Sequence, residues 1–109
     1  MAEISEREWE ADESAYADAD EFCDACLIDL NQTGAGKVKD NCKLPVYEPK
    51  REGGRLNRHA VHAAAVVLAG GRGGIDAPAQ AKRAAAGKLL RLYRELDEEP
   101  PESIQRLAE

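Results

Sequence analysis

The second half of the chain carries two stripes of apolar residues at helical spacing. One is formed by Val61, Ala64, Ala65 and Leu68, and the other by Ala81, Ala85, Leu89, Leu92 and Leu96. Asn57 can cap the first helix and Gly70 can end it, while Asp76 and Pro78 suit the start of the second. The pattern therefore predicts a helix from Asn57 through Ala69 and a longer one that ends near Asp97.

The first half shows a weaker helical pattern. Phe22, Cys26 and Leu30 recur every four residues. They predict a helix that begins at an acidic cap, Asp18 or Asp20, and stops near Asn31.

Two prolines indicate the backbone conformation of the next segment. Pro45 and Pro49 lack a backbone donor and disfavour helical conformation in the residues before them. Residues Cys42 to Tyr47 are therefore expected to be extended. They can pair with the residues around Leu56 across a glycine turn at residues 53–54.

These elements predict a mainly α fold of three or four helices with a short extended segment or β-hairpin. A short final helix is expected after Pro100-Pro101. Residues 1–17 are acidic and lack an apolar period, so they are predicted to form a flexible acidic tail before a single helical domain at residues 18–109. Trp9 and Tyr16 are the large aromatic residues of this tail. They either dock on the domain or a partner, or remain exposed.

Alanine dominates the apolar content. The 43% of hydrophobic residues includes 19 Ala, but only 20 residues are Ile, Leu, Val or Phe. A core with so few bulky apolar side chains needs additional stabilisation from helix packing, a bound metal or a partner surface. No stretch approaches the roughly 20 apolar residues of a membrane span, so a cytoplasmic protein without a membrane partner is expected.

Charge is segregated along the chain, whose formal net charge is −6. Residues 1–36 hold 11 acidic residues and one basic residue, residues 37–94 hold 13 basic and four acidic residues, and residues 95–109 are acidic again. The acidic ends can fold back on the basic centre, or the patches can face neighbouring molecules. The balance of charge favours the intramolecular arrangement.

One side of the longest predicted helix is basic. Plotted at about 100° per residue, its arginines lie opposite the apolar stripe. Together with an arginine of the preceding glycine-rich loop, the candidate partner-binding residues are Arg72, Lys82, Arg83, Lys88, Arg91 and Arg94. A solvated helix face is the simpler alternative. In a nucleic-acid-contacting module, the same residues would neutralise phosphates.

The cysteines and histidines suggest one structural zinc ion. Cys23 and Cys26 are followed by Cys42, and His62 is the preferred fourth ligand, with His59 as the alternative. Zinc would stabilise a thin core in a reducing compartment. The cysteines can instead be reduced, partly buried residues, or two of them can form a disulfide.

No catalytic constellation stands out in the sequence. The Cys-x-x-Cys pair lacks a preceding strand, and neither a Ser/His/Asp set nor a poised pair of carboxylates is visible. The glycine run at residues 70–74 lacks the strand and the Lys of a phosphate-binding loop. The chain is therefore not expected to be an enzyme.

From Cys42 onward, several short motifs follow one another in a recognisable order. They are Lys43-Leu44-Pro45-Val46, Glu48-Pro49, Leu56-Asn57, Val61-His62-Ala63-Ala64-Ala65, residues 68–74, Ala77-Pro78, residues 89–95 and Pro100-Pro101-Glu102. This order resembles a small domain of tailed-phage and prophage proteins. That domain accompanies prohead-protease and other head-morphogenesis modules. The resemblance implies a viral assembly context, in which protease chemistry belongs to a neighbouring module.

Taken together, the residues and the resemblance predict an accessory protein-interaction module of a phage or prophage particle. Its expected partners are viral structural or assembly proteins, and its expected location is the cytoplasm of the bacterial host or the virion. A nucleic-acid-contacting module that uses the basic face of residues 72–94 is the alternative.

Overall fold

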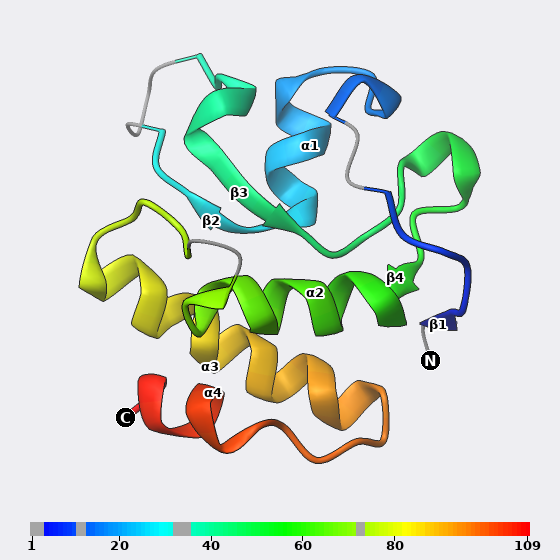
Figure 1. Cartoon of the computed structure of the whole chain (residues 1–109). Coiled ribbons are helices and arrows are strands. Elements are labelled where there is room, and N and C mark those ends of the chain that lie inside the picture. The colour runs from blue at the N-terminus through cyan, green and yellow to red at the C-terminus, as the bar shows by residue number, and fades with distance from the viewer. Residues whose placement is uncertain (1–3, 11–12, 32–35, 72–73) are drawn as a thin grey trace. The chain divides into compact units, whose positions relative to one another are not determined.

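The computed structural model describes residues 4–10, 13–31, 36–71 and 74–109 (Figure 1). Within these residues it contains four α-helices and four short strands, which agrees with a mainly α fold in this coarse sense. The chain forms two compact units, residues 1–60 and 61–109. The boundary between the units falls inside helix α2 (Arg58–Leu68). The single helical domain at residues 18–109 stays a prediction.

A helix packed on a β-hairpin forms the centre of unit 1. Strands β2 (Cys26–Asp29) and β3 (Cys42–Pro45) are antiparallel, and helix α1 (Ala19–Ala25) contacts both of them. A second, parallel pair joins β1 (Ile4–Ser5) to β4 (Leu56–Asn57).

Helix α1 starts after Asp18, the first of the two caps that the sequence offers, but it ends earlier than predicted. The side chain of Asp18 accepts a hydrogen bond from Glu21 N at 2.8 Å, as expected of an N-cap. The helix ends at Ala25, however, and the chain continues as β2, so the prediction of a helix to Asn31 is wrong. Pairing with β3 satisfies the backbone of β2 and allows both Leu27 and Ile28 to be buried.

Residues 4–10 and 13–17 are part of unit 1, in contrast to the predicted separate tail. Strand β1 pairs with β4, and Tyr16 is only 4% exposed. The Tyr16 hydroxyl donates to Tyr47 O at 2.5 Å, and its ring meets Phe22 edge to face. These contacts hold the acidic N-terminal segment to the rest of unit 1, although few of its own residues are regularly spaced apolar ones. The remaining predicted tail residues, 1–3 and 11–12, lie outside the described residues.

The extended segment pairs as predicted. Tyr47 and Leu56 form an antiparallel bridge, and Asn57 N donates to Val46 O at 2.9 Å. Gly53 and the residue after it have positive φ values of 113° and 62°, which a glycine turn accommodates without steric cost.

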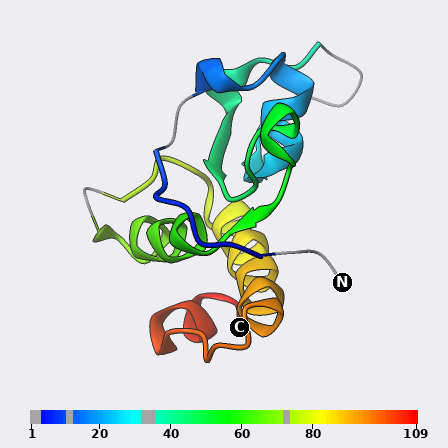
Figure 2. The same cartoon turned by 90° about the vertical axis from the view of Figure 1, so that its right-hand side faces the viewer.

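Unit 2 is built from helices. The larger part of α2, from Val61 onward, is followed by α3 (Ala79–Glu95) and α4 (Glu102–Leu107), and Figures 1 and 2 both show α4 folded back beside α3. The buried residues of α3 and α4 include Ala85, Leu89 and Ile104, each 0% exposed. Gly70 has a φ of 105°, which confirms its predicted role after α2. Among the described residues, every helix is too short or too polar to cross a membrane.

Candidate functional sites: a cysteine cluster and a basic helix face

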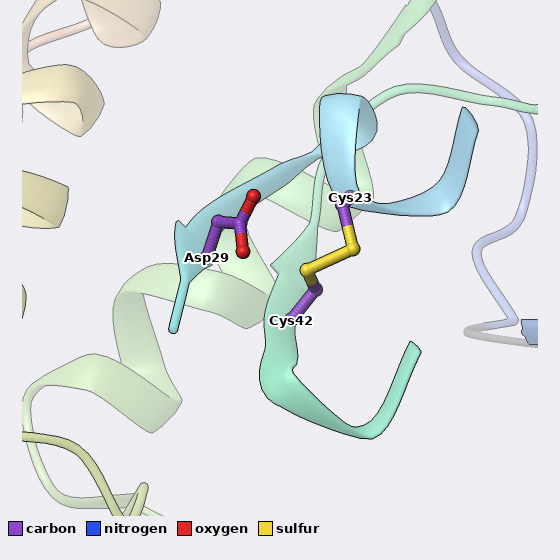
Figure 3. A group of neighbouring side chains, drawn as sticks. All are labelled: Cys23, Asp29 and Cys42. Atoms are coloured by element: carbon purple, nitrogen blue, oxygen red, sulfur yellow. A yellow bond between two sulfur atoms is a disulfide. The ribbon is translucent and has the colours of Figure 1, made fainter. Parts of the chain in front are cut away.

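A disulfide joins Cys23 of α1 to Cys42 of β3, and the Cα atoms of the two residues are 5.3 Å apart. Figure 3 shows both sulfur atoms between the helix and the strand, with Asp29 of β2 nearby. The two cysteines are separated by 19 positions in the sequence. The bond therefore ties α1 covalently to the β2–β3 hairpin. Of the three cysteine states that the sequence leaves open, the structure has the disulfide.

Polar side chains from the end of β2 surround the disulfide. One ligand atom each from Cys23, Asp29 and Cys42 lies within 4.8 Å of the others. The side-chain nitrogen of Asn31 is 3.2 Å from Cys42 Sγ and 3.6 Å from Cys23 Sγ, so it can donate to sulfur. Asp29 accepts a hydrogen bond from Lys37 Nζ at 2.8 Å, which holds the pKa of the carboxyl below its usual value.

The structure brings together two of the four predicted zinc ligands. These two, Cys23 and Cys42, form a disulfide, and a disulfide sulfur is not the thiolate that zinc requires. Cys26 is a half-buried free thiol outside the cluster, and burial raises its pKa to about 12. His62 belongs to unit 2, where its Nε2 lies 2.9 Å from Glu98 Oε1.

Reduction would change what this cluster can do. Two thiols would replace the disulfide, and Cys23, Asp29 and Cys42 could then hold a metal ion through two sulfur atoms and one oxygen. His59, the alternative histidine ligand, is exposed on α2. In the oxidised form the cluster is a covalent crosslink.

Helix α3 presents the basic face that its sequence predicts. Arg83, Arg91 and Arg94 are exposed, and no hydrogen bond or ion pair joins their side chains to another described residue. Lys88 is exposed as well, whereas Lys82 is half-buried. Arg72, the sixth residue predicted for this surface, lies outside the described residues. The described part of the predicted surface thus lies on one helix.

Gly87 lies in the middle of this basic face. It follows Arg83 by one turn and precedes Arg91 by one turn, so the three residues share a side of α3. A Cβ atom built at Gly87 would have no atom within 4 Å, so the packing within the protein does not require a glycine there. Glycine inside a helix costs about 0.5–1 kcal/mol relative to alanine.

In unit 1, by contrast, the acidic N-terminal segment pairs with basic residues of the centre. Arg58 Nε lies 2.8 Å from Glu6 Oε1, and Lys37 forms the pair with Asp29 already described. This part of the charge segregation is compensated within the chain, as the sequence favours. Exposed pairs of this kind stabilise a fold by about 0.2–1 kcal/mol each.

A buried polar network in unit 1 was missed by the sequence analysis. Glu48 is 6% exposed, and its Oε2 accepts from Ser5 Oγ at 2.5 Å and from Asn57 Nδ2 at 2.9 Å. Asn57 Oδ1 accepts from Ala60 N at 2.9 Å, which confirms its predicted capping role. Alternation in the extended segment could have signalled the burial, because Val46 and Glu48 share one face of a strand.

In comparisons with family models, curated proteins and solved structures, no match to this chain was found.

Proposed function

We propose that this protein is a non-catalytic protein-interaction module that binds an acidic partner surface through the exposed face of α3. The observation that carries the proposal is the set of three exposed arginines, Arg83, Arg91 and Arg94, which have no partner among the described residues. Arginine is favoured at protein interfaces because its planar guanidinium binds carboxylates in a bidentate manner. An acidic partner would supply those carboxylates.

Gly87 supports the same surface. A residue that weakens the helix and has open space around it allows another molecule to approach the backbone of α3 closely. The flanking arginines, Arg83 and Arg91, lie one turn away on either side and are placed to hold such a molecule by its acidic groups.

The setting that we propose is the assembly of a phage or prophage particle, with viral structural or assembly proteins as partners. The support for this setting is the order of residues from Cys42 to Glu102, which resembles a small domain found beside head-morphogenesis modules. A bacterial host cytoplasm or a virion is the corresponding location.

The test is co-purification and crosslinking with the capsid, portal and protease proteins of one particle. A variant with Arg83→Gln, Arg91→Gln and Arg94→Gln is expected to lose at least tenfold in affinity for the captured protein. The control, Lys43→Gln with Lys50→Gln and Arg106→Gln, removes the same charge elsewhere and is expected to bind normally. Capture of none of these proteins, or equal binding by both variants, would overturn the proposal.

Nucleic acid is the alternative ligand for the same face. A titration with duplex DNA at two salt concentrations separates the two, because phosphate binding falls steeply as salt rises. Tight, salt-steep binding that the triple arginine variant loses would favour the nucleic-acid module. Absence of binding at low salt would exclude it.

We also propose that the reduced protein holds one structural zinc ion at Cys23, Asp29 and Cys42. The support is the closeness of their ligand atoms, within 4.8 Å of one another. A dithiol reductant supplies two electrons and two protons to the disulfide, and zinc then displaces the thiol protons. Metal analysis after reduction should give one zinc per chain, and Cys42→Ser should abolish it. A metal-free reduced protein would refute zinc binding without affecting the proposal for α3.

A further inference from the structure

Unit 1 contains a cavity of about 320 Å³. Its walls come from the segment after β1, from residues around Tyr16 and from the turn that follows Tyr47. This volume is at the lower end of the range for small-molecule sites, so it suits a single side chain or a molecule of similar size. The cavity uses none of the residues of the α3 face or the cysteine cluster.

Glu48 lines the cavity with an incompletely paired carboxylate. The side chain is 5% exposed, and its Oε2 accepts both hydrogen bonds that the carboxylate receives, from Ser5 and Asn57. The nearest cationic atom to Oε1 is Arg7 Nη1 at 3.9 Å, which is too far for a hydrogen bond. Among the described residues, no donor therefore reaches Oε1. Oε1 is therefore open to the cavity, because no fully buried side-chain oxygen of the described residues lacks a hydrogen-bond partner, and a ligand with an N–H group can donate to it.

The charge of the residues that line the cavity favours the binding of a cation. Four glutamates line the cavity, Glu8, Glu10, Glu48 and Glu52, against two arginines. Both arginines, Arg7 and Arg51, are already engaged with Glu52, at 3.0 Å and 3.8 Å. The remaining carboxylates leave the cavity with an excess of negative charge.

Two aromatic residues favour a flat cation. Trp9 is half-buried and lines the cavity, and Tyr16, which is only 4% exposed, also belongs to its lining. The Tyr16 hydroxyl is bonded to Tyr47 O, so Trp9 is the aromatic side chain of the lining that a ligand can stack on. A guanidinium group stacks on aromatic faces and donates in-plane hydrogen bonds to a carboxylate, whereas an ammonium has no plane to stack.

We propose that this cavity binds a guanidinium group, with Glu48 Oε1 as its acceptor and Trp9 as its stacking surface. The group would come from an arginine side chain of a partner protein or from a free arginine-like molecule. The site goes beyond the proposed function, because it lies in unit 1 and does not depend on α3.

The experiment uses the full chain, whose single tryptophan is Trp9, so that its fluorescence reports on the cavity directly. N-acetyl-arginine amide is titrated alongside the citrulline amide, which has nearly the same shape without the charge, and the lysine amide. We expect saturable binding of the arginine amide, at least tenfold weaker binding of the citrulline amide, and intermediate binding of the lysine amide. Equal responses to the arginine and citrulline amides would overturn the proposal.

Variants then test the acceptor. Glu48→Gln keeps an oxygen for Ser5 and Asn57 but loses the charge, and it is expected to bind the arginine amide at least tenfold more weakly. Glu99→Gln, an exposed glutamate of unit 2, is the matched control and should bind normally. If Glu48→Gln does not fold, as judged by circular dichroism, Trp9→Leu followed by calorimetry replaces it and should show the same loss. Unchanged affinity in the folded variant would contradict the proposal.

One further titration distinguishes the two sources of the guanidinium group. A short peptide with a central arginine is compared with the amide in the same titration. Tighter binding of the peptide supports a protein side chain as the occupant, and equal affinities support a free small molecule. Failure of every arginine probe would refute the site and leave the α3 experiment to be decided by its own result.

Discussion

In residues 1–60, several charged side chains form ion pairs close by, whereas the long helix of residues 61–109 presents three arginine side chains that have none among the described residues. Unit 1 combines the ion pairs of Arg58 and Lys37 with the buried Glu48 network and a disulfide. In unit 2 the buried side chains of α3 are alanine, leucine and tyrosine. In a chain with few bulky apolar residues, ion pairs, buried hydrogen bonds and a disulfide thus stabilise one unit, and helix packing stabilises the other.

Paired and unpaired surface charges also differ in what they offer to another molecule. Charges that are compensated inside a unit contribute little to an encounter with another molecule, because their fields largely cancel. Charges on the α3 face keep their field and remain available for a partner. The three unpaired arginine side chains of α3 are therefore the basis of the partner surface that we propose on the helical unit.

The largest expected effect concerns Cys26, the free thiol of unit 1. Its pKa is raised to about 12 by burial, with Glu13 and Asp29 adding to the shift. At pH 8 the thiolate population should be about a thousandfold smaller than for a thiol of pKa 9.0. Iodoacetamide should therefore label Cys26 in the native protein about a thousandfold more slowly than in urea, as followed by mass spectrometry under non-reducing conditions.

The raised pKa of Cys26 also makes the stability of the fold depend on pH. The unfolded chain loses the Cys26 proton near pH 9 and the native chain only near pH 12, so the native state holds more protons between these values. Stability should be unaffected by this group below pH 9 and should fall as the pH rises above it. Equal labelling rates in native and unfolded protein would contradict both expectations.

Loss of the disulfide is expected to destabilise unit 1 by about 3 kcal/mol, because the unfolded chain regains the entropy of a closed loop. The change is Cys23→Ala with Cys42→Ala, and Cys26→Ala is the control that keeps the bond. Hydrogen exchange should show lost protection in the β2–β3 hairpin and little change in α3. Equal loss of protection in α3 would show that the two units do not unfold separately.

A smaller effect is expected at Asn57, which both caps α2 and donates to Glu48. Asn57→Ala should cost about 2 kcal/mol in urea denaturation, since it removes a cap and a donor to a buried carboxylate. Asn57→Ser can keep the cap but not the donor, and should cost less. If both variants lose the same amount, the cap contributes nothing measurable.

The smallest effect has the opposite sign. Gly87→Ala should stabilise the protein by about 0.5–1 kcal/mol, because alanine is the better helix former and the added Cβ meets open space. The measurement is the midpoint of urea denaturation, with Ala84→Gly on the same exposed side of α3 as the inverse control. Destabilisation by Gly87→Ala would show that the space at this position is filled.

Local signals predicted much of this fold. The caps at Asp18 and Asn57 and the glycine at position 70 depend on a few neighbouring residues, and each has the role that the sequence predicts. The basic face of α3 depends only on helical periodicity, so Arg83, Arg91 and Arg94 were placed correctly relative to the buried stripe.

Pairings between distant segments could not be predicted in the same way. The helical spacing of Phe22 and Cys26 crosses the junction between α1 and β2, because the strand is defined by its partner β3 and not by its own residues. The spacing of the cysteines is compatible with zinc, thiols or a disulfide, because spacing along the chain does not determine which sulfur atoms the fold brings together. The buried Glu48 network joins three separate segments, so only a hint of it was present in the sequence.

Helix α2 has a consequence for anyone who wishes to study the units apart. It passes from one packing unit into the other without an intervening loop, so a cut between residues 60 and 61 would sever the hydrogen-bond ladder of a continuous helix. Each unit would then carry a frayed stub with unsatisfied backbone groups. Dissection should therefore retain the entire helix on whichever fragment is expressed.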